Sequence, residues 1–219
     1  AQIPSESELS AQFGVSVGTI RKAVETLVAD SILVKRGGTG TFVNSYRNTG
    51  YFNHFQIVRQ DGVHIRDYDE RRLVKVETVP VTGSIAASLK VPEGTLVTYL
   101  LRHFYRNTGP IRTLTAVDEI YLHPGLFKGM TRQRFEDRFL PTDSLYQFYD
   151  REFGVVITSQ KCAVTWNELK SPDFDRLQMP EWKNSVTIRR LSKTWGRSPV
   201  EVRIHHFEPQ RIRIEFDIE

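Results

Sequence analysis

The sequence predicts an α+β protein in two parts: a small amino-terminal unit of helices and a hairpin, and a larger unit made mostly of antiparallel sheet. Three observations support this. Capped, amphipathic segments fill the first 30 residues. Glycine-rich and proline-rich turns separate short β-rich runs after residue 50. A hydrophobic content of 39% with 26% charged residues is typical of a globular chain, and 219 residues suffice for one large or two modest domains.

The first helix is predicted over residues 5–13. Ser5 and Glu8 have the spacing of a capping box, in which the hydroxyl accepts from the Glu8 amide and the carboxylate accepts from the Ser5 amide. Gly14 ends the helix, and a tight turn begins at Val15.

A second, longer helix is predicted over residues 17–30, with Ser16 as its N-cap. One face carries an apolar stripe at helical spacing, formed by Ile20, Ala23, Val24, Leu27 and Val28. The opposite face is polar and carries Thr19, Arg21, Lys22 and Glu25. Two short helices joined by a glycine-containing turn are typical of a helix-turn-helix, whose second helix enters the major groove of DNA.

Residues 32–36 and 41–44 are predicted to be the two strands of a hairpin, because the glycine-rich residues 37–40 between them supply a tight turn. A hairpin that directly follows a recognition helix is a wing. The alternative is that residues 5–44 are two ordinary core helices and a surface hairpin, since such segments are common.

These elements resemble the winged helix of the GntR family of bacterial transcription regulators. The matching positions are Pro4, Ser5, Glu6, Leu9, residues 13–16, Thr19, Arg21, Ala23, Leu27 and residues 38–43. The resemblance implies a partner, double-stranded operator DNA. It implies contacts from Ser5, Ser16, Thr19, Arg21, Lys22, Arg36, Gly38, Thr39 and Gly40. The family pattern has a further helix before Pro4, so residues 1–44 are expected to be an amino-terminally truncated DNA-binding domain.

Net charge alone does not predict DNA binding here. The chain carries +4, but residues 1–45 balance to zero, from the basic Arg21, Lys22, Lys35 and Arg36 and the acidic Glu6, Glu8, Glu25 and Asp30. Many family members have Arg at the positions of Ser7 and Val17, where Arg can read guanine. Specificity is therefore expected to depend on Thr19, Arg21, the wing glycines and DNA shape.

Residues 45–50 are polar and turn-rich and are predicted to be a linker, followed by a second domain over residues 51–219. Its strands are predicted over residues 55–58, 73–81, 97–105, 111–120, 155–166, 186–194, 200–207 and 212–216. Its helices are predicted over residues 84–89, 144–153 and 172–177. Residues 84–120 and 173–207 repeat one pattern of helix, strand, turn and strand, which would build a sheet with two similar halves and a cleft between them.

The second domain resembles the effector-binding (UTRA) domain of the HutC-like branch of the GntR family, which shares its fold with chorismate lyase. The motifs that carry the resemblance are Arg102 near a strand end and residues 109–111, 144–146 and 198–201. The resemblance implies a homodimer and a small-molecule effector. It places Arg102, Phe104, Ser144, Tyr146, Glu201 and Arg203 around that effector. The two arginines can fork a carboxylate or phosphate, and the amides of the helix that Ser144 opens favour an anion.

Two departures narrow the expected effector. Phe104 stands where sugar-phosphate binders have a second Arg, and Leu114 stands where they have a carboxylate. Each change removes a polar partner, and an unpaired buried polar group costs about 1–3 kcal/mol. We therefore expect a smaller or more apolar carboxylate, with an aromatic one as an option. The competing interpretation makes Arg102, Glu201 and Arg203 solvated strand residues and Tyr146 a core residue.

Several classes of protein are not expected. The chain has no run of 18 apolar residues that could span a membrane and shows no signal peptide at its start. The single Cys162 is expected to be a core thiol in a cytoplasmic protein. No cofactor is expected, and no metal site, since the histidines are scattered and His205 and His206 alternate on a strand.

The sequence predicts a DNA-binding repressor controlled by the effector, and two rival functions stay open. One is a lyase-like enzyme, although no nucleophile and base are evident as a pair. The other is a DNA-binding protein whose second domain only dimerises. A cleft filled by apolar side chains would favour that second rival, and convergent Arg, Ser and Glu would oppose it.

Overall fold

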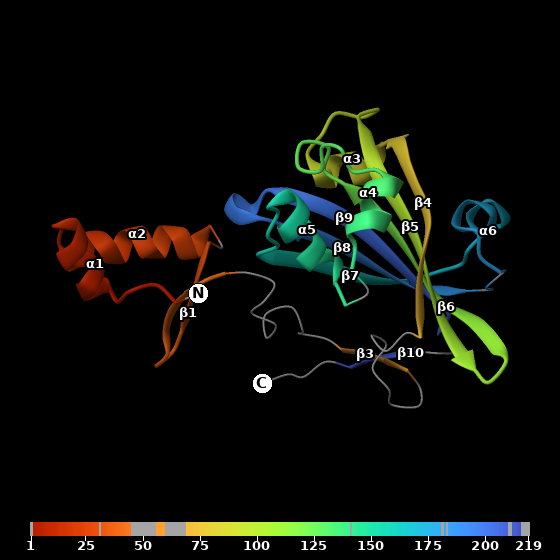
Figure 1. Cartoon of the computed structure of the whole chain (residues 1–219), viewed down its shortest axis with the longest axis horizontal. Helices are drawn as coiled ribbons and strands as arrows, with labels where there is room; N and C mark the ends of the chain where they lie inside the picture. The colour runs from red at the N-terminus through yellow and green to blue at the C-terminus, as the bar shows by residue number, and fades with distance from the viewer. Residues whose placement is uncertain are drawn as a thin grey trace.

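The computed structural model describes residues 2–30, 32–44, 56–59, 69–140, 142–180, 182, 184–209 and 212–215. The predicted linker over residues 45–50 lies outside the described residues, as do Phe55 and Phe216 at the ends of two predicted strands. Figure 1 shows the two predicted parts, a helical unit with a hairpin and a larger sheet domain.

The predicted pair of amino-terminal helices is present as α1 (Glu6–Phe13) and α2 (Val17–Ala29). The Ser5 hydroxyl accepts from the Glu8 amide at 3.2 Å, and the Ser5 amide donates to the Glu8 carboxylate at 2.7 Å, which completes the capping box. Gly14 ends α1 with a φ of 65°, a left-handed conformation that suits glycine.

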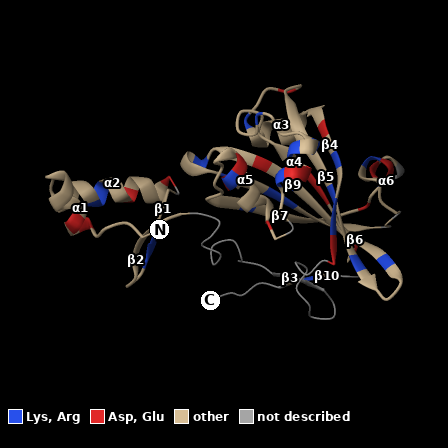
Figure 2. Cartoon of the chain, viewed as in Figure 1, with Lys and Arg blue, Asp and Glu red and all other residues tan. Residues whose placement is uncertain are grey.

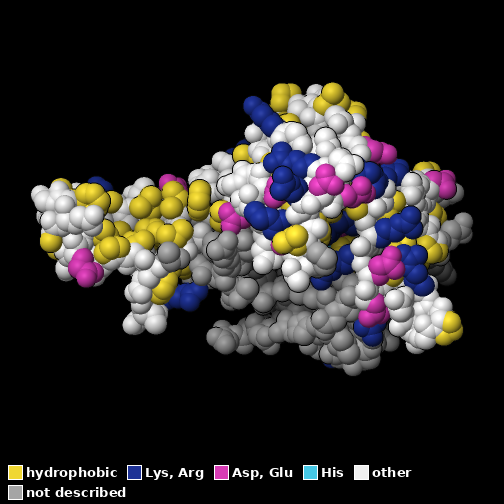
Figure 3. All heavy atoms as spheres, in the orientation of Figure 1, with side chains coloured by type: hydrophobic (Ala, Val, Ile, Leu, Met, Phe, Trp, Pro, Cys, Tyr) yellow, Lys and Arg dark blue, Asp and Glu magenta, His cyan; other side chains and the backbone are white. Residues whose placement is uncertain are grey.

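The wing is present as β1 (Leu33–Arg36) and β2 (Gly40–Val43), which pair antiparallel. Ile20 and Val24 of α2 are buried against Leu33, but Ala23 and Leu27 of the predicted stripe are exposed. Figure 3 shows apolar side chains gathered along this unit. The exposed large apolar residues there are Phe13, Val15, Val17 and Leu27. A patch of this kind is typical of surface that contacts another segment or partner.

The second part is a six-stranded antiparallel sheet in the order β4-β5-β6-β9-β8-β7. Its strands are β4 (Glu70–Pro80), β5 (Leu96–Thr108), β6 (Ile111–Leu122), β7 (Ser159–Asn167), β8 (Ser185–Lys193) and β9 (Pro199–Phe207). The order is symmetric, with β4, β5 and β6 matching β7, β8 and β9 about the central β6–β9 pair. The predicted sheet of two similar halves is therefore present.

Helices cover both faces of this sheet. On one, the α5 face, α4 (Arg132–Arg138) and α5 (Leu145–Phe153) pack over the largest apolar cluster (Figure 1). Its fully buried members are Leu100, Ile120, Leu122, Phe148, Tyr149, Ile157 and Val200. The opposite, α6 face packs against α3 (Gly83–Leu89) and α6 (Ser171–Leu177), which lie at matching places in the two halves. Within the described ranges, none of the helices has the length and apolarity needed to span a bilayer.

The structure differs from the sequence predictions for this domain in three places. Helix α4 was not predicted, because Phe135 is its one buried residue and a single apolar residue makes no periodic stripe. The strand predicted from residue 155 begins at Ser159, since Val155 and Ile157 are buried in the core without strand pairing. β7 is an edge strand, so Cys162 is half-buried rather than a core thiol.

A separate two-stranded ribbon pairs β3 (Gln56–Arg59) with β10 (Ile212–Glu215). Ile212 packs with Phe104, Ile188 and Phe207, so β10 lies against the sheet.

Candidate functional site

The proposed DNA-reading residues lie on the surface of the winged helix. Thr19, Arg21 and Lys22 are all exposed on α2, and Figure 2 marks in blue the positions of Lys and Arg along the ribbon of α2 and the wing. The alternative of two ordinary core helices required this surface to be packed inside the molecule. The exposed polar face of α2 therefore has a route to a DNA groove.

The Glu6 carboxylate pairs with two cations of the winged helix, Arg21 of α2 and Lys35 of β1. Arg21 Nε donates to Glu6 Oε2 at 2.9 Å, and Lys35 Nζ donates to Glu6 Oε1 at 3.2 Å. The hydrogen bond from Arg21, followed by the one from Lys35, lowers the pKa of Glu6 below its ordinary value. Glu6 thus joins the start of α1 to the recognition helix and to the wing.

Ser5 and Ser16 both act as helix caps. The Ser16 hydroxyl accepts from the Thr19 amide at 3.1 Å and lies 2.9 Å from the Thr19 hydroxyl. At the wing tip, Gly38 and Gly40 have φ values of 72° and 117°, which residues with a Cβ rarely adopt. The Ser5 and Ser16 hydroxyls therefore have a structural role as helix caps, whether or not they also contact DNA.

The second candidate site lies on the α5 face of the sheet. Arg102 of β5 is opposite Asp118 of β6, and Asp118 is opposite His205 of β9. Because side chains alternate along a strand, Glu201 and Arg203 lie on the same face as His205. Arg102, Glu201 and Arg203 are 7%, 0% and 8% exposed, so the interpretation of these three as solvated strand residues is wrong.

Glu201 sits among four donors. Its carboxylate accepts from the Tyr149 hydroxyl at 2.7 Å, from Ser192 at 3.1 Å and from Tyr146 at 3.3 Å, and Arg203 lies at 2.9 Å. Burial, together with the Glu201 charge, raises the pKa of Tyr149 well above its ordinary value. Protein groups therefore occupy both oxygens of Glu201, and its role is to position Arg203 and Tyr146.

Asp118 links Arg102 to His205. One oxygen accepts from Arg102 Nη2 at 2.6 Å, and the other lies 2.6 Å from His205 Nδ1. Burial alone would raise the pKa of Asp118, but His205 and Arg102 outweigh it and hold that pKa well below its ordinary value. His205 also stacks between Phe104, at 5.4 Å, and Phe207, at 4.3 Å. Asp118 therefore stays charged and fixes the direction of the Arg102 guanidinium.

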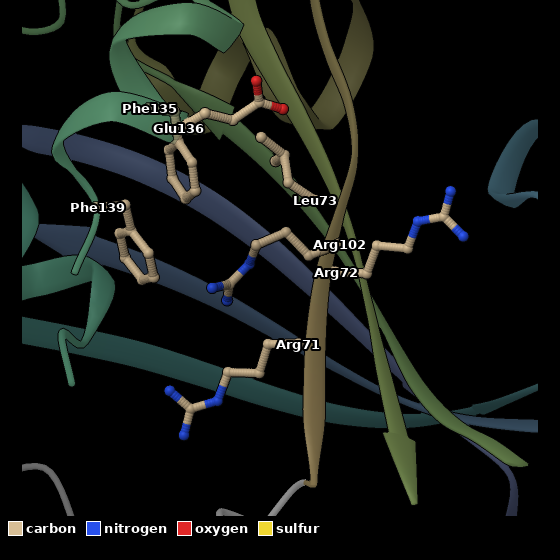
Figure 4. Close-up of a pocket in the computed structure, with 7 residues that line it drawn as sticks. All are labelled: Arg71, Arg72, Leu73, Arg102, Phe135, Glu136 and Phe139. Carbon is tan, nitrogen blue, oxygen red and sulfur yellow. The ribbon is translucent and has the colours of Figure 1, made fainter. Parts of the chain in front are cut away.

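A cavity of about 140 Å³ opens between β4, β5 and α4. It is lined by Arg71, Arg72, Leu73, Arg102, Phe135, Glu136 and Phe139. In Figure 4, Arg71 and Arg102 point to the same side as the two phenylalanine rings, whereas Arg72 points the opposite way and Glu136 points up and away from them. The cavity thus combines cationic groups with aromatic walls, and it is not the apolar-filled cleft of a purely structural domain.

The other two predicted effector residues differ in position. Phe104 is buried, and the Arg102 guanidinium lies over its ring, 5.0 Å from the ring centroid. Phe104 therefore packs against Arg102. Ser144 is exposed and caps α5, accepting from the Gln147 amide at 3.2 Å. The structure therefore brings Tyr146, Glu201 and Arg203 into direct contact. Of the six predicted effector residues, Arg102 is the one that lines the cavity, and it pairs with Asp118.

Sequence reasoning missed Asp118, His205 and Arg71. A usable signal existed for His205, because Glu201, Arg203 and His205 recur every second residue on one strand and so share a face. Asp118 had no such local signal, since its place depends on the pairing of β6 with β9.

The α6 face carries a second buried network. Glu119 Oε1 lies 3.0 Å from His206 Nε2, and Arg176 of α6 pairs with the other oxygen. The hydroxyls of Tyr99 and Tyr121 donate to that same oxygen at 3.1 and 3.2 Å. His205 and His206 thus serve opposite faces, as predicted. No group of three or more metal-ligating side chains occurs in the part of the chain that the structure describes.

Family comparisons divide the chain at the same place as the fold. Residues 1–43 match the family described as "Bacterial regulatory proteins, gntR family", and residues 70–213 match the family described as "UTRA domain". Among solved structures, the ligand-binding domain of a GntR-family regulator from Bordetella bronchiseptica superposes with a TM-score of 0.61 at 18% identity, over 77% of this chain and 99% of that one. At that identity the likeness shows the fold alone.

Two curated relatives are transcriptional repressors. The "Probable fructoselysine utilization operon transcriptional repressor" of Escherichia coli K12 is 24% identical over 99% of this chain and 85% of its own length. The "Histidine utilization repressor" of Pseudomonas putida is 28% identical over 91% of this chain and 75% of its own length. These homologues are regulators and not enzymes, which argues against the lyase-like alternative.

Proposed function

The chain belongs to the GntR family of bacterial regulatory proteins and carries a UTRA domain, and from this we propose that it is a repressor whose operator affinity is set by a small carboxylate. The observation that carries the proposal is the cavity at Arg102, which places oriented guanidinium and aromatic groups together in a domain joined to an exposed recognition helix. We assign residues 1–44 to DNA binding, 45–50 to the linker, and 51–219 to effector binding and dimerisation.

On the DNA side, the proposed readers are Thr19, Arg21 and Lys22 of α2 with Arg36, Gly38, Thr39 and Gly40 of the wing, and the caps Ser5 and Ser16 hold the backbone that carries them. Arg21 keeps its terminal nitrogens available because Glu6 accepts from its Nε. A bidentate Arg–guanine contact is worth about 1–3 kcal/mol of discrimination.

On the effector side, a carboxylate suits the site better than a phosphorylated amino sugar. Arg102 and Arg203 offer donors to an acidic group, and the amides at the start of α5, which Ser144 opens, favour an anion. Phe104 and Leu114 are both buried and offer no polar atom to a sugar hydroxyl. Phe135 and Phe139 stack on each other at 4.6 Å beside Arg102 and form a wall for an apolar or aromatic body.

We propose that the working unit is a homodimer. A two-fold dimer matches the two half-sites of a palindromic operator. An effector that changes the spacing or mobility of the two winged helices needs a coupling of about 1–3 kcal/mol to weaken operator binding 5- to 150-fold.

The DNA half of the proposal is tested with operators selected from random duplexes and fluorescence anisotropy. Arg21→Ala should abolish specific binding, while Lys128→Ala, which removes the same charge from an exposed position of the sheet domain, should leave it unchanged. An unchanged footprint for Arg21→Ala would contradict the assignment.

The effector half is tested by adding single compounds to the protein–operator complex and to the free protein. Small aliphatic and aromatic carboxylates should raise the melting temperature and shift operator affinity, and Arg102→Gln should remove both effects. Stabilisation by sugar phosphates alone would sink the carboxylate assignment.

A further inference from the structure

Arg190 is a further cation on the α5 face. It lies on β8, directly opposite Arg203 on β9 and opposite Cys162 on edge strand β7. Since cross-strand partners share a face, Arg190 lies on the same side of the sheet as Arg203, Glu201 and Arg102. Its side chain is half-buried.

The carboxylates on this face are already committed to other partners. Glu201 pairs with Arg203, and Asp118 pairs with Arg102 and His205. Among the described residues, no Asp or Glu oxygen lies within 4.0 Å of an Arg190 nitrogen. On strands β5, β6, β9 and β8, three guanidinium groups therefore share this face with two carboxylates, and among the described residues Arg190 is the one of the three without a carboxylate partner.

The arginine nitrogens on this face are also short of acceptors. The Nε atoms of Arg102, Arg190 and Arg203 are buried and have no hydrogen-bond partner in the described part of the chain. The side chains of Arg102 and Arg203 are themselves 9% and 10% exposed. A buried donor without an acceptor destabilises the folded state, and such donors are uncommon in native structures.

Like charges directly opposite each other on paired strands are destabilising. Arg190 and Arg203 are such a pair, and they stand beside the Tyr146 ring, over which Arg203 lies at 5.3 Å. Arginines without a counter-charge and with unpaired N–H donors can bind an anion, since the anion supplies both a negative charge and hydrogen-bond acceptors.

We propose that Arg190 and Arg203 form a second anion subsite, so that the effector carries two acidic groups, one at Arg102 and one at Arg190. This deepens the proposed function and rests on it. Arg102 on β5 and Arg190 on β8 are three strands apart, which is about 14 Å between backbones at ~4.8 Å per strand. The matching class is a dicarboxylate whose body separates its two acidic ends by a comparable length.

The first test needs no ligand. If Arg190 belongs to an anion site, Arg190→Gln in the full chain removes an uncompensated charge from the ligand-free protein. The melting temperature of this variant should therefore exceed that of wild type by about 2 °C or more. Lys161→Gln removes one charge from an exposed position on the neighbouring strand and should leave the melting temperature unchanged. A fall in the melting temperature of Arg190→Gln would assign the residue a structural role and overturn the subsite.

The second test compares matched probes by titration calorimetry: octanedioate against octanoate, and terephthalate against benzoate. The dianions should bind wild type at least tenfold more tightly, and Arg190→Gln should erase that preference while retaining monoanion binding. Equal binding of both charge types to both proteins would overturn the second subsite and leave the carboxylate proposal standing. Absence of binding by every probe would overturn both.

Discussion

The Glu201 carboxylate is fully buried and surrounded by donors, which makes the folded state sensitive to its removal. Removing the charge of a buried pair leaves its partner uncompensated, and Arg203 would then be a buried cation without a counter-ion.

Glu201→Gln should therefore destabilise the protein by about 3 kcal/mol in urea unfolding. The matched control is Glu136→Gln, because Glu136 pairs with Arg132 at 3.0 Å with both side chains half-exposed. Its effect should stay within about 0.5 kcal/mol. Equal losses in the two variants would contradict the role given to Glu201.

Glu6 should decide how selectively the winged helix binds DNA. Glu6→Gln leaves Arg21 and Lys35 without their shared carboxylate, so non-specific affinity should rise through phosphate attraction while the preference for operator over random DNA falls. Glu25→Gln removes the same charge from α2 and should raise non-specific affinity without changing the preference. Anisotropy titrations across a salt series separate the two results.

At the scale of elements, two substitutions of Ser144, the cap of α5, test folding stability and effector binding separately. Ser144→Ala should cost about 1 kcal/mol of folding stability, because the capping hydrogen bond to the Gln147 amide is lost. Ser144→Asp retains a cap and adds a negative charge at the helix start. It should therefore keep stability but weaken carboxylate binding by up to about fivefold. Carboxylate affinity that Ser144→Asp leaves unaltered would remove α5 from the site.

The elements that local chemistry defines were predictable, and those that depend on distant pairing were not. The caps at Ser5, Ser16 and Ser144 were all visible in the sequence, since a cap and its partner amide lie three residues apart. Asp118 meets His205 only because β6 pairs with β9, and no local pattern sets that register. The same reason hid the partner of Arg21, because Glu6 lies on a different helix.

At the scale of the whole molecule, the free energy of unfolding should fall with pH over a defined acidic range. The pKa values of Asp118 and Glu119 are both held below their ordinary values, for Asp118 by His205 and Arg102 and for Glu119 by His206 and Arg176, in each case against the effect of burial. A carboxyl group whose pKa is lowered by folding stabilises the native state above its unfolded-state pKa, and that stability is lost as pH falls toward the native value.

Urea unfolding should therefore show constant contributions from these groups above about pH 5 and a steep loss below about pH 4. Asp118→Asn should be less stable at neutral pH and should show a shallower loss in acid. If wild type and Asp118→Asn gave parallel pH profiles, Asp118 would not be the group responsible.

Asp118 and Glu119 are neighbours in the chain, and so are their partners His205 and His206, so the two carboxylate–histidine pairs lie back to back across the central β6–β9 junction. Sheets usually fray from their outer strands inward. Here acid protonates Asp118 and Glu119, which lie where the two similar halves meet, so the contacts on both faces of the β6–β9 pair weaken together. Acid should accordingly split this domain from its middle into two three-stranded halves, before its edges have peeled away.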